Sequence, residues 1–155
     1  MSDQRPHEGN VGDPPSPSPL PLPHEVLPHR APFLFLDRIS ECGEQRVVGW
    51  RRFTPSEPFF EGHFPERPVV PGVILIEALA QTLGYWALRA RPNHWVLLTG
   101  VESAKFSQLV EPNDELCFEV SVLKARHGVV IAEGRCSRAG EVVAQAKLKG
   151  FLQPR

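Results

Sequence analysis

The chain has 155 residues, of which 41% are hydrophobic and 23% charged, and its formal net charge is −1 at pH 7. These values indicate one soluble globular domain with its own core, because the chain is too short for two. The lysines and arginines are scattered, which argues against a nucleic-acid surface, where a basic stripe is expected. The three cysteines lack paired or metal-ligand spacing, which argues against a metal site and favours a reducing, cytoplasmic setting.

The N-terminal segment is rich in proline and lacks the apolar stretch of a signal peptide. We expect residues 1–25 to form a disordered, extended tail and residues 26–155 to form the domain, because proline supports neither helix nor sheet hydrogen bonding. A solvated tail without function is the favoured interpretation, and a docking peptide for a proline-binding module is the alternative. No membrane span is predicted, since the longest apolar run, 73–88, is interrupted by polar residues and is shorter than the roughly 20 residues that a bilayer requires.

The first half of the domain predicts two strands, a loop and a helix, in that order. The strand-like runs are 33–40 and 46–53, with turn-prone residues between them. The loop covers 54–72, and loops of this length inside a compact domain are usually functional. The run from Val73 to about Ala90 predicts a helix that is apolar on nearly every face. Such a helix is buried, either in a core or at an interface.

The second half predicts four strands, a short one and three long ones, at 95–102, 114–126, 128–140 and 141–152. Alternation places one set of side chains on a common face of the first long strand: Leu116, Phe118, Val120 and Val122. It does the same in the last strand for Val142, Ala144, Ala146 and Leu148. The segments ARHG and RAGE indicate antiparallel hairpins with glycine in the turn.

One long buried helix among antiparallel strands indicates an α+β fold. A strongly curved antiparallel sheet can wrap a single helix, and a second copy of the chain can cover what the sheet leaves open. The pattern therefore predicts a dimer.

The segment EGHFPERPVVPGVILIE (Glu61–Glu77) carries the candidate chemistry. Glu77 is the carboxylate inside the apolar helix, and ionised carboxylates are rarely buried without a partner. Gln81 lies one turn later on the same face and can hydrogen-bond to Glu77. Burial would favour the protonated form of the carboxyl, which suits a proton donor. A solvent gap or a salt bridge is the alternative interpretation of such a glutamate.

His63 lies in a rigid apolar surround of glycine, phenylalanine and prolines, which would hold a neutral imidazole in place as a general base. Gly72 opens the helix, so its unpaired N–H at the positive end of the dipole could bind a carbonyl oxygen, although a plain helix start is the alternative. Together, these groups suit removal of a proton α to a carbonyl with loss of a β-hydroxyl as water. The remaining histidines are given no role: His7, His24, His29, His94 and His127.

A family resemblance lies in three stretches: LPHRAPFLFLDRI (Leu27–Ile39), EPFFEGHFPERPVVPGVILIEALAQTLG (Glu57–Gly84) and TGVESAKFSQLVEPNDEL (Thr99–Leu116). They resemble the (3R)-hydroxyacyl-[acyl-carrier-protein] dehydratase family, FabZ type. The resemblance implies a hot-dog fold and a homodimer that often assembles into trimers of dimers. It implies dehydration to a trans-2-enoyl thioester, in fatty-acid or related polyketide or polyene synthesis, without a metal or redox cofactor. The substrate would arrive on the phosphopantetheine of acyl carrier protein.

The resemblance also implies roles for individual residues. His63 as base and Glu77 as acid would come from opposite subunits, Gly72 would bind the thioester carbonyl, and Gln81 would support the acid. The pocket would be lined by Phe64, Val70 and Pro71. Departures from the family pattern are Ala31 in place of an aromatic residue, Val70 in place of methionine, and Gln108–Leu109 in place of a basic or proline-containing pair.

Glutamate rather than aspartate at position 77 favours plain dehydration without isomerisation, on the pattern of the family. Two other classes remain as alternatives on the same fold, an acyl-thioester hydrolase and a non-catalytic module that binds acyl carriers. The GHFP loop around His63 argues against the hydrolase. The joint presence of His63, Glu77 and Gly72 argues against the binding module.

Overall fold

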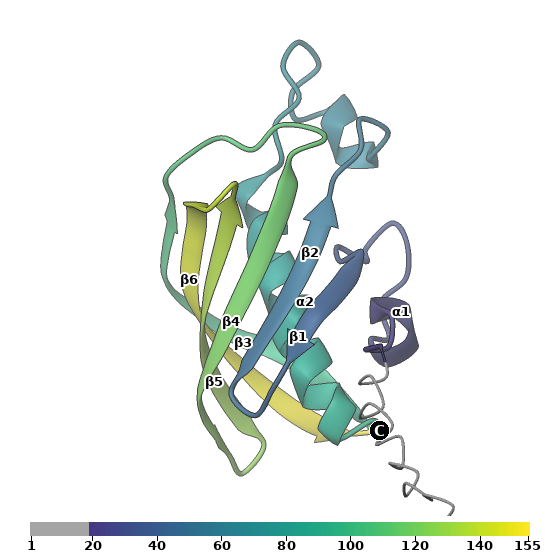
Figure 1. The fold of residues 1–155 in the computed structure, drawn as a ribbon, viewed down its shortest axis with the longest axis vertical. Helices are drawn as coiled ribbons and strands as arrows, with labels where there is room; N and C mark the ends of the chain where they lie inside the picture. The colour runs from purple at the N-terminus through teal and green to yellow at the C-terminus, as the bar shows by residue number, and fades with distance from the viewer. Residues whose placement is uncertain (1–18) are drawn as a thin grey trace, which may run out of the picture.

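The computed structural model describes residues 19–155. One long helix, α2 (Gly72–Ala90), packs against a six-stranded antiparallel sheet of order β1-β2-β4-β5-β6-β3. The strands are β1 (Arg38–Cys42), β2 (Arg46–Arg52), β3 (His94–Phe106), β4 (Glu115–Arg126), β5 (Val129–Arg138) and β6 (Glu141–Pro154). Two short helices are α1 (Pro23–Val26) and η1 (Pro58–Glu61). The sheet curves around α2 (Figure 1), which confirms the predicted α+β hot-dog architecture.

The helix α2 lies in the concave face of the sheet and forms the centre of the core. Two strand glycines allow this close approach. A Cβ at Gly134 of β5 would lie 2.9 Å from the Leu79 side chain, and one at Gly49 of β2 would lie 3.0 Å from Thr82. Burial of most of α2 confirms the prediction from its apolar composition. Its first turn is the exception, because the Val73 side chain is 74% exposed.

The predicted strand boundaries hold for β2, β4 and β5 but differ at β1 and β3. The run 33–40 was predicted as a strand, yet β1 begins only at Arg38. At Phe35 the backbone bonds to a side chain of α2 instead of a neighbouring strand, since the Phe35 N–H donates to Gln81 Oε1. Strand β3 extends to Phe106 and is longer than predicted. Both hairpin turns are confirmed, with positive φ angles at Gly128 and Gly140.

The alternation predicted for the last strand is wrong at its start. Ala144, Ala146 and Leu148 share one face as predicted, and that face is buried, but Val142 is 36% exposed and Val143 is fully buried. The cause is a bulge in the β5–β6 ladder. Cys136 pairs with Ala144 and Ser137 pairs with Val142, so Val143 is an extra residue and the inward face shifts by one position.

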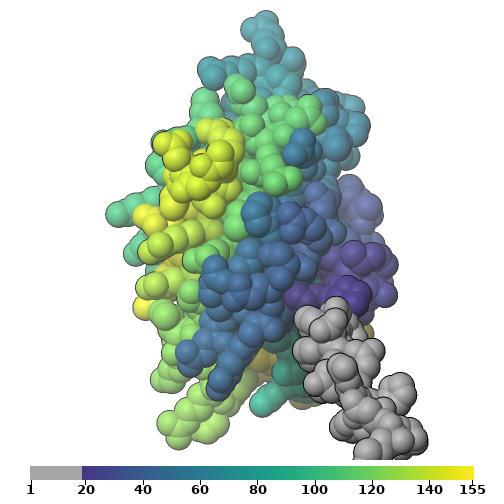
Figure 2. Space-filling model, viewed as in Figure 1, coloured from purple at the N-terminus to yellow at the C-terminus, as the bar shows by residue number. Residues whose placement is uncertain are grey.

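The predicted domain boundary also differs from the structure. Residues 19–25 were assigned to the tail, but Tyr85 Oη donates a hydrogen bond to the Pro21 carbonyl oxygen at 2.7 Å, and α1 begins at Pro23. Proline is tolerated there because the first helical N–H groups have no intrahelical acceptor. In Figure 2, α1 (purple) lies against the body of the domain. The rest of the predicted tail, residues 1–18, lies outside the described residues.

None of the helices within residues 19–155 has the length and hydropathy needed to cross a bilayer.

Candidate active site

His63 lies in the loop between η1 and α2, and the backbone of Val69 holds its ring. Nδ1 of His63 lies 2.9 Å from the Val69 carbonyl oxygen, and the Val69 N–H donates back to the His63 carbonyl at 3.1 Å. A carbonyl oxygen only accepts hydrogen bonds, so Nδ1 carries the proton and Nε2 keeps its lone pair. The ring of Phe64 stacks on the imidazole, with 4.1 Å between centroids. This is the tautomer and the fixed orientation that a general base requires at Nε2.

The cavity beside His63 is largely apolar and has a volume of about 470 Å³. Phe64, Val70 and Gly72 line it together with His63. The loop that carries His63 forms the upper tip of the molecule in Figures 1 and 2. Pro71, which was also predicted to line the pocket, is the N-cap residue of α2, and its carbonyl accepts the Ile74 N–H at 2.9 Å.

Gly72 is the first residue of α2, so its N–H has no intrahelical acceptor. The ring of Phe106, at the end of β3, lies against this glycine. A Cβ added to Gly72 would lie 2.8 Å from the ring, closer than van der Waals contact permits. Packing against Phe106 therefore requires glycine here, in addition to any requirement that a ligand imposes.

Glu77 lies one turn into α2 with its side chain 23% exposed, and Gln81 holds it as predicted. Gln81 Nε2 donates to Glu77 Oε1 at 3.0 Å and to the Phe33 carbonyl at 2.9 Å, while Gln81 Oε1 accepts the Phe35 N–H at 2.8 Å. The amide is therefore anchored on both sides by backbone that does not belong to the sheet. A buried, fully bonded amide gives the carboxylate a fixed orientation.

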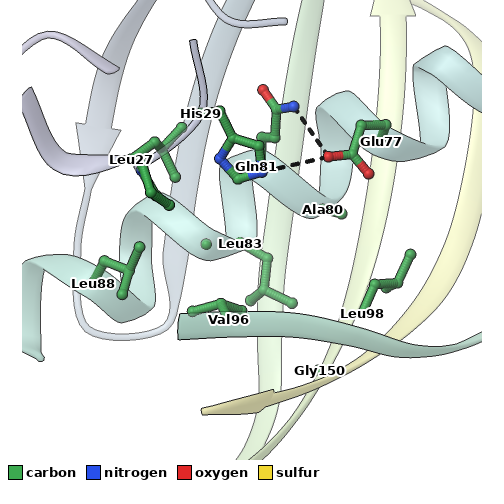
Figure 3. Close-up of a pocket in the computed structure, with 12 residues that line it drawn as sticks. Leu27, His29, Glu77, Ala80, Gln81, Leu83, Leu88, Val96, Leu98 and Gly150 are labelled. Carbon is green, nitrogen blue, oxygen red and sulfur yellow. Dashed lines mark hydrogen bonds and ion pairs between the residues drawn. The ribbon is translucent and has the colours of Figure 1, made fainter. Parts of the chain in front are cut away.

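His29, to which the sequence analysis assigned no role, faces the same carboxylate. Its Nε2 lies 3.6 Å from Glu77 Oε1, and Figure 3 shows the contacts from His29 and Gln81 meeting at one oxygen. Burial lowers the pKa of His29; Glu77 opposes this shift and Arg30 adds to it. No spacing rule relates residues so far apart in the chain. The one available signal was that His29 falls within the first stretch that resembles the family.

His63 and Glu77 line different cavities. The cavity at Glu77 has a volume of about 70 Å³, and its wall includes His29, Gln81 and apolar side chains of α2 and β3. Within one chain, His63 therefore lies beside Gly72, and Glu77 lies beside Gln81 and His29, in two separate groups.

The chain matches one family model and curated proteins over most of its length. Residues 27–147 match the family described as a FabA-like domain. The chain is 42% identical over 127 residues to 3-hydroxyacyl-[acyl-carrier-protein] dehydratase FabZ of Caldanaerobacter subterraneus subsp. tengcongensis, covering 80% of this chain and 90% of that one. It is 44% identical to the protein of the same name from Solibacter usitatus, covering 79% of this chain and 78% of that one.

Solved structures share the fold at lower identity. The dehydratase heterocomplex ApeI:P from Xenorhabdus doucetiae aligns with a TM-score of 0.78 at 20% identity, covering 88% of this chain and 93% of that one. A hypothetical thioesterase with coenzyme A from Streptococcus pneumoniae TIGR4 aligns with a TM-score of 0.60 at 12% identity, covering 76% and 86%. These likenesses concern the fold. The family match and the sequence identities together establish that this chain belongs to the FabZ-type 3-hydroxyacyl-[acyl-carrier-protein] dehydratase family.

Proposed function

We propose that this protein removes water from (3R)-hydroxyacyl groups carried on acyl carrier protein and releases trans-2-enoyl thioesters. The reaction serves fatty-acid synthesis or a related polyketide or polyene pathway. The observation that carries the proposal is the hydrogen bond from His63 Nδ1 to the Val69 carbonyl, which leaves Nε2 free as a base beside an apolar cavity. The names of the FabZ relatives, which describe this dehydratase activity, support it.

The reaction divides between two side chains. His63 Nε2 takes the α-proton, the electron pair of that C–H bond forms the Cα–Cβ double bond, and the Cβ–O bond breaks. Glu77 donates its proton to the departing hydroxyl, which leaves as water. The cycle ends with an imidazolium and a carboxylate, which exchange one proton with solvent to restore the starting state. The N–H of Gly72 stabilises the enolate-like charge on the thioester oxygen.

The working unit is a homodimer in which His63 of one subunit acts with Glu77 of the other. Two features support this: His63 and Glu77 line different cavities of one chain, and β3 is an edge strand of the sheet. Large apolar side chains are exposed along β3: Trp95, Leu97, Leu98, Val101 and Phe106. An edge strand with exposed apolar side chains invites pairing with a second copy about a two-fold axis. Assembly into trimers of dimers is the further expectation for this family.

The partner is acyl carrier protein, which presents the substrate on phosphopantetheine, and the reaction takes place in the cytoplasm. The substrate carrier is named in the relatives that this chain matches. Glutamate at position 77 favours plain dehydration, so the double bond stays at the 2-position. The reaction needs no metal or redox cofactor, because proton transfer alone completes the elimination.

The deciding experiment follows the mass of acyl carrier protein loaded with (3R)-hydroxyacyl chains of several lengths. Loss of one water from the carrier with wild-type protein, and none with His63→Ala, is the expected result. Release of a free acid would identify a thioester hydrolase instead. Binding of the carrier with no mass change at any chain length would identify a non-catalytic acyl-carrier module.

A further inference from the structure

The environment of the Glu77 carboxylate is asymmetric. Both neighbouring groups that approach it, Gln81 Nε2 at 3.0 Å and His29 Nε2 at 3.6 Å, lie next to the same atom, Oε1. Figure 3 shows Oε2 turned away from both of them. A carboxyl group whose one oxygen accepts hydrogen bonds from the protein presents its other oxygen to a substrate. That second oxygen can carry the acidic proton only if no other donor hydrogen-bonds to it.

The two nitrogens of His29 lie in different environments. Nε2 faces Glu77, whereas Nδ1 is buried and has no hydrogen-bond partner among the described residues. An imidazolium would bury a charged N–H at Nδ1 without an acceptor, which is costly. The neutral tautomer with hydrogen on Nε2 avoids this cost and aims its one donor at the carboxylate.

Of the two charges near His29, Arg30 favours the neutral form and Glu77 opposes it. Glu77 on α2 faces it, and Arg30 follows it in its own segment with its guanidinium bonded to the Leu27 and His29 carbonyls. The other residues that line this cavity, from α2, β3 and β6, carry no charge. Burial is the largest of the effects on the pKa of His29 and lowers it, in agreement with the geometry.

We propose that His29 is a positioning residue for Glu77, whose neutral Nε2–H is directed at Oε1 and leaves Oε2 to deliver the proton to the substrate. This inference rests on the proposed function, in which Glu77 is the acid. The 3.6 Å separation is longer than a hydrogen bond, and catalytic contacts that are long without substrate commonly tighten when it is bound. A neutral donor orients the carboxyl, whereas a cation in the same place would hold Glu77 as a carboxylate and remove the acid.

The test is the pH profile of turnover on hydroxyacyl carrier protein for three variants at this position. His29→Phe removes the donor, so kcat falls about tenfold at an unchanged KM, as expected for the loss of one hydrogen bond to a group that becomes charged as it gives up its proton. The alkaline limb of the profile moves to higher pH, since the carboxylate loses stabilisation. His29→Lys adds a permanent cation and moves that limb to lower pH. His29→Gln keeps a neutral N–H donor and retains most of the turnover.

The matched control is His24→Phe, because His24 is an exposed histidine on α1 and does not contact Glu77. It should reproduce the wild-type profile. If the wild-type protein is active and His29→Phe keeps the same kcat and pH profile, the inference about His29 is wrong and the proposed function stands. A wild-type protein that dehydrates none of the substrates would overturn the proposed function and this inference with it. Should His29→Phe not fold, identical profiles for His29→Gln and His29→Lys would overturn the inference.

Discussion

The Nδ1 atom of His63 lies 2.9 Å from the carbonyl oxygen of Val69, and this contact selects the ring nitrogen that is free to act as a base. Because the acceptor is a main-chain atom, no side-chain substitution at Val69 removes it. The return bond from the Val69 N–H to the His63 carbonyl closes the loop on itself, so the imidazole is oriented before any substrate binds.

His63→Ala and Glu77→Gln should each lower turnover by about 10²–10⁴-fold, the range for loss of a general acid or base. Both side chains are part-exposed, so the fold and the dimer should persist. The measurement is steady-state dehydration, with size-exclusion chromatography as the check on assembly. Glu61→Gln and His24→Ala, at exposed positions, are matched controls. Near-normal turnover in His63→Ala or Glu77→Gln would contradict the assignment.

Mixed dimers test the sharing of the site between subunits. When His63→Ala and Glu77→Gln proteins exchange subunits at random, half of the dimers are hybrid and each holds one intact His63–Glu77 pair. Activity should recover to about a quarter of the wild-type value, since a two-fold dimer carries two equivalent sites. The exchange itself is followed by mass spectrometry of tagged subunits. A mixture that stays inactive after proven exchange would place both groups in one subunit.

Gly72→Ala should destabilise the protein by about 1–3 kcal/mol, the usual cost of overpacking, because the new Cβ would meet the Phe106 ring at 2.8 Å. Adding Phe106→Ala should restore stability in urea unfolding. Turnover should stay below that of Phe106→Ala alone, since the methyl group still crowds the N–H that we propose as the thioester-binding group. Equal turnover in the double variant and Phe106→Ala would mean that glycine is required only for packing.

Gln81→Leu should lower both stability and turnover. The change leaves the buried Phe35 N–H without its acceptor, at a cost of about 1–3 kcal/mol, and also removes the part-buried bond to the Phe33 carbonyl. It also frees the Glu77 carboxyl to rotate. Chemical denaturation and kcat are the measurements, and Gln153→Leu, at an exposed position of β6, is the control. Loss of stability without loss of turnover would limit Gln81 to a structural role.

The stability of the fold should decrease on acidification through His29. Burial lowers the pKa of this side chain below its ordinary value of 6.5, so the unfolded chain takes up the proton at higher pH than the folded chain does. The folded state therefore loses stability as the pH falls below 6.5, and the full penalty is reached below the pKa of the folded state. Urea unfolding above and below that pH should show a smaller difference in His29→Phe than in wild type. An equal pH dependence in the two proteins would contradict this assignment.

Local patterns were sufficient for most of the elements. The boundaries of β2, β4 and β5 were predictable because period-two alternation and glycine turns depend on neighbours in the chain. The helix α2 was predictable for a similar reason, since a long apolar run starts after a proline–glycine pair. The conformation of the segment around Phe35 was not predictable. Its apolar residues indicate a strand, but the Phe35 N–H bonds to the Gln81 side chain.

By itself the sequence determined the fold class, the family and the identity of His63, Glu77, Gly72 and Gln81 as candidates, because these depend on residue type and spacing along the chain. Only the tertiary structure decided which ring nitrogen of His63 is free, that Val143 rather than Val142 faces inward, and that His29 faces Glu77. The His29–Glu77 contact joins segments distant in sequence, whereas the His63–Val69 bond and the β5–β6 bulge depend on a loop conformation and a strand register that residue type does not fix. Such contacts arise from the packing of strands and loops around one helix, which no local pattern encodes.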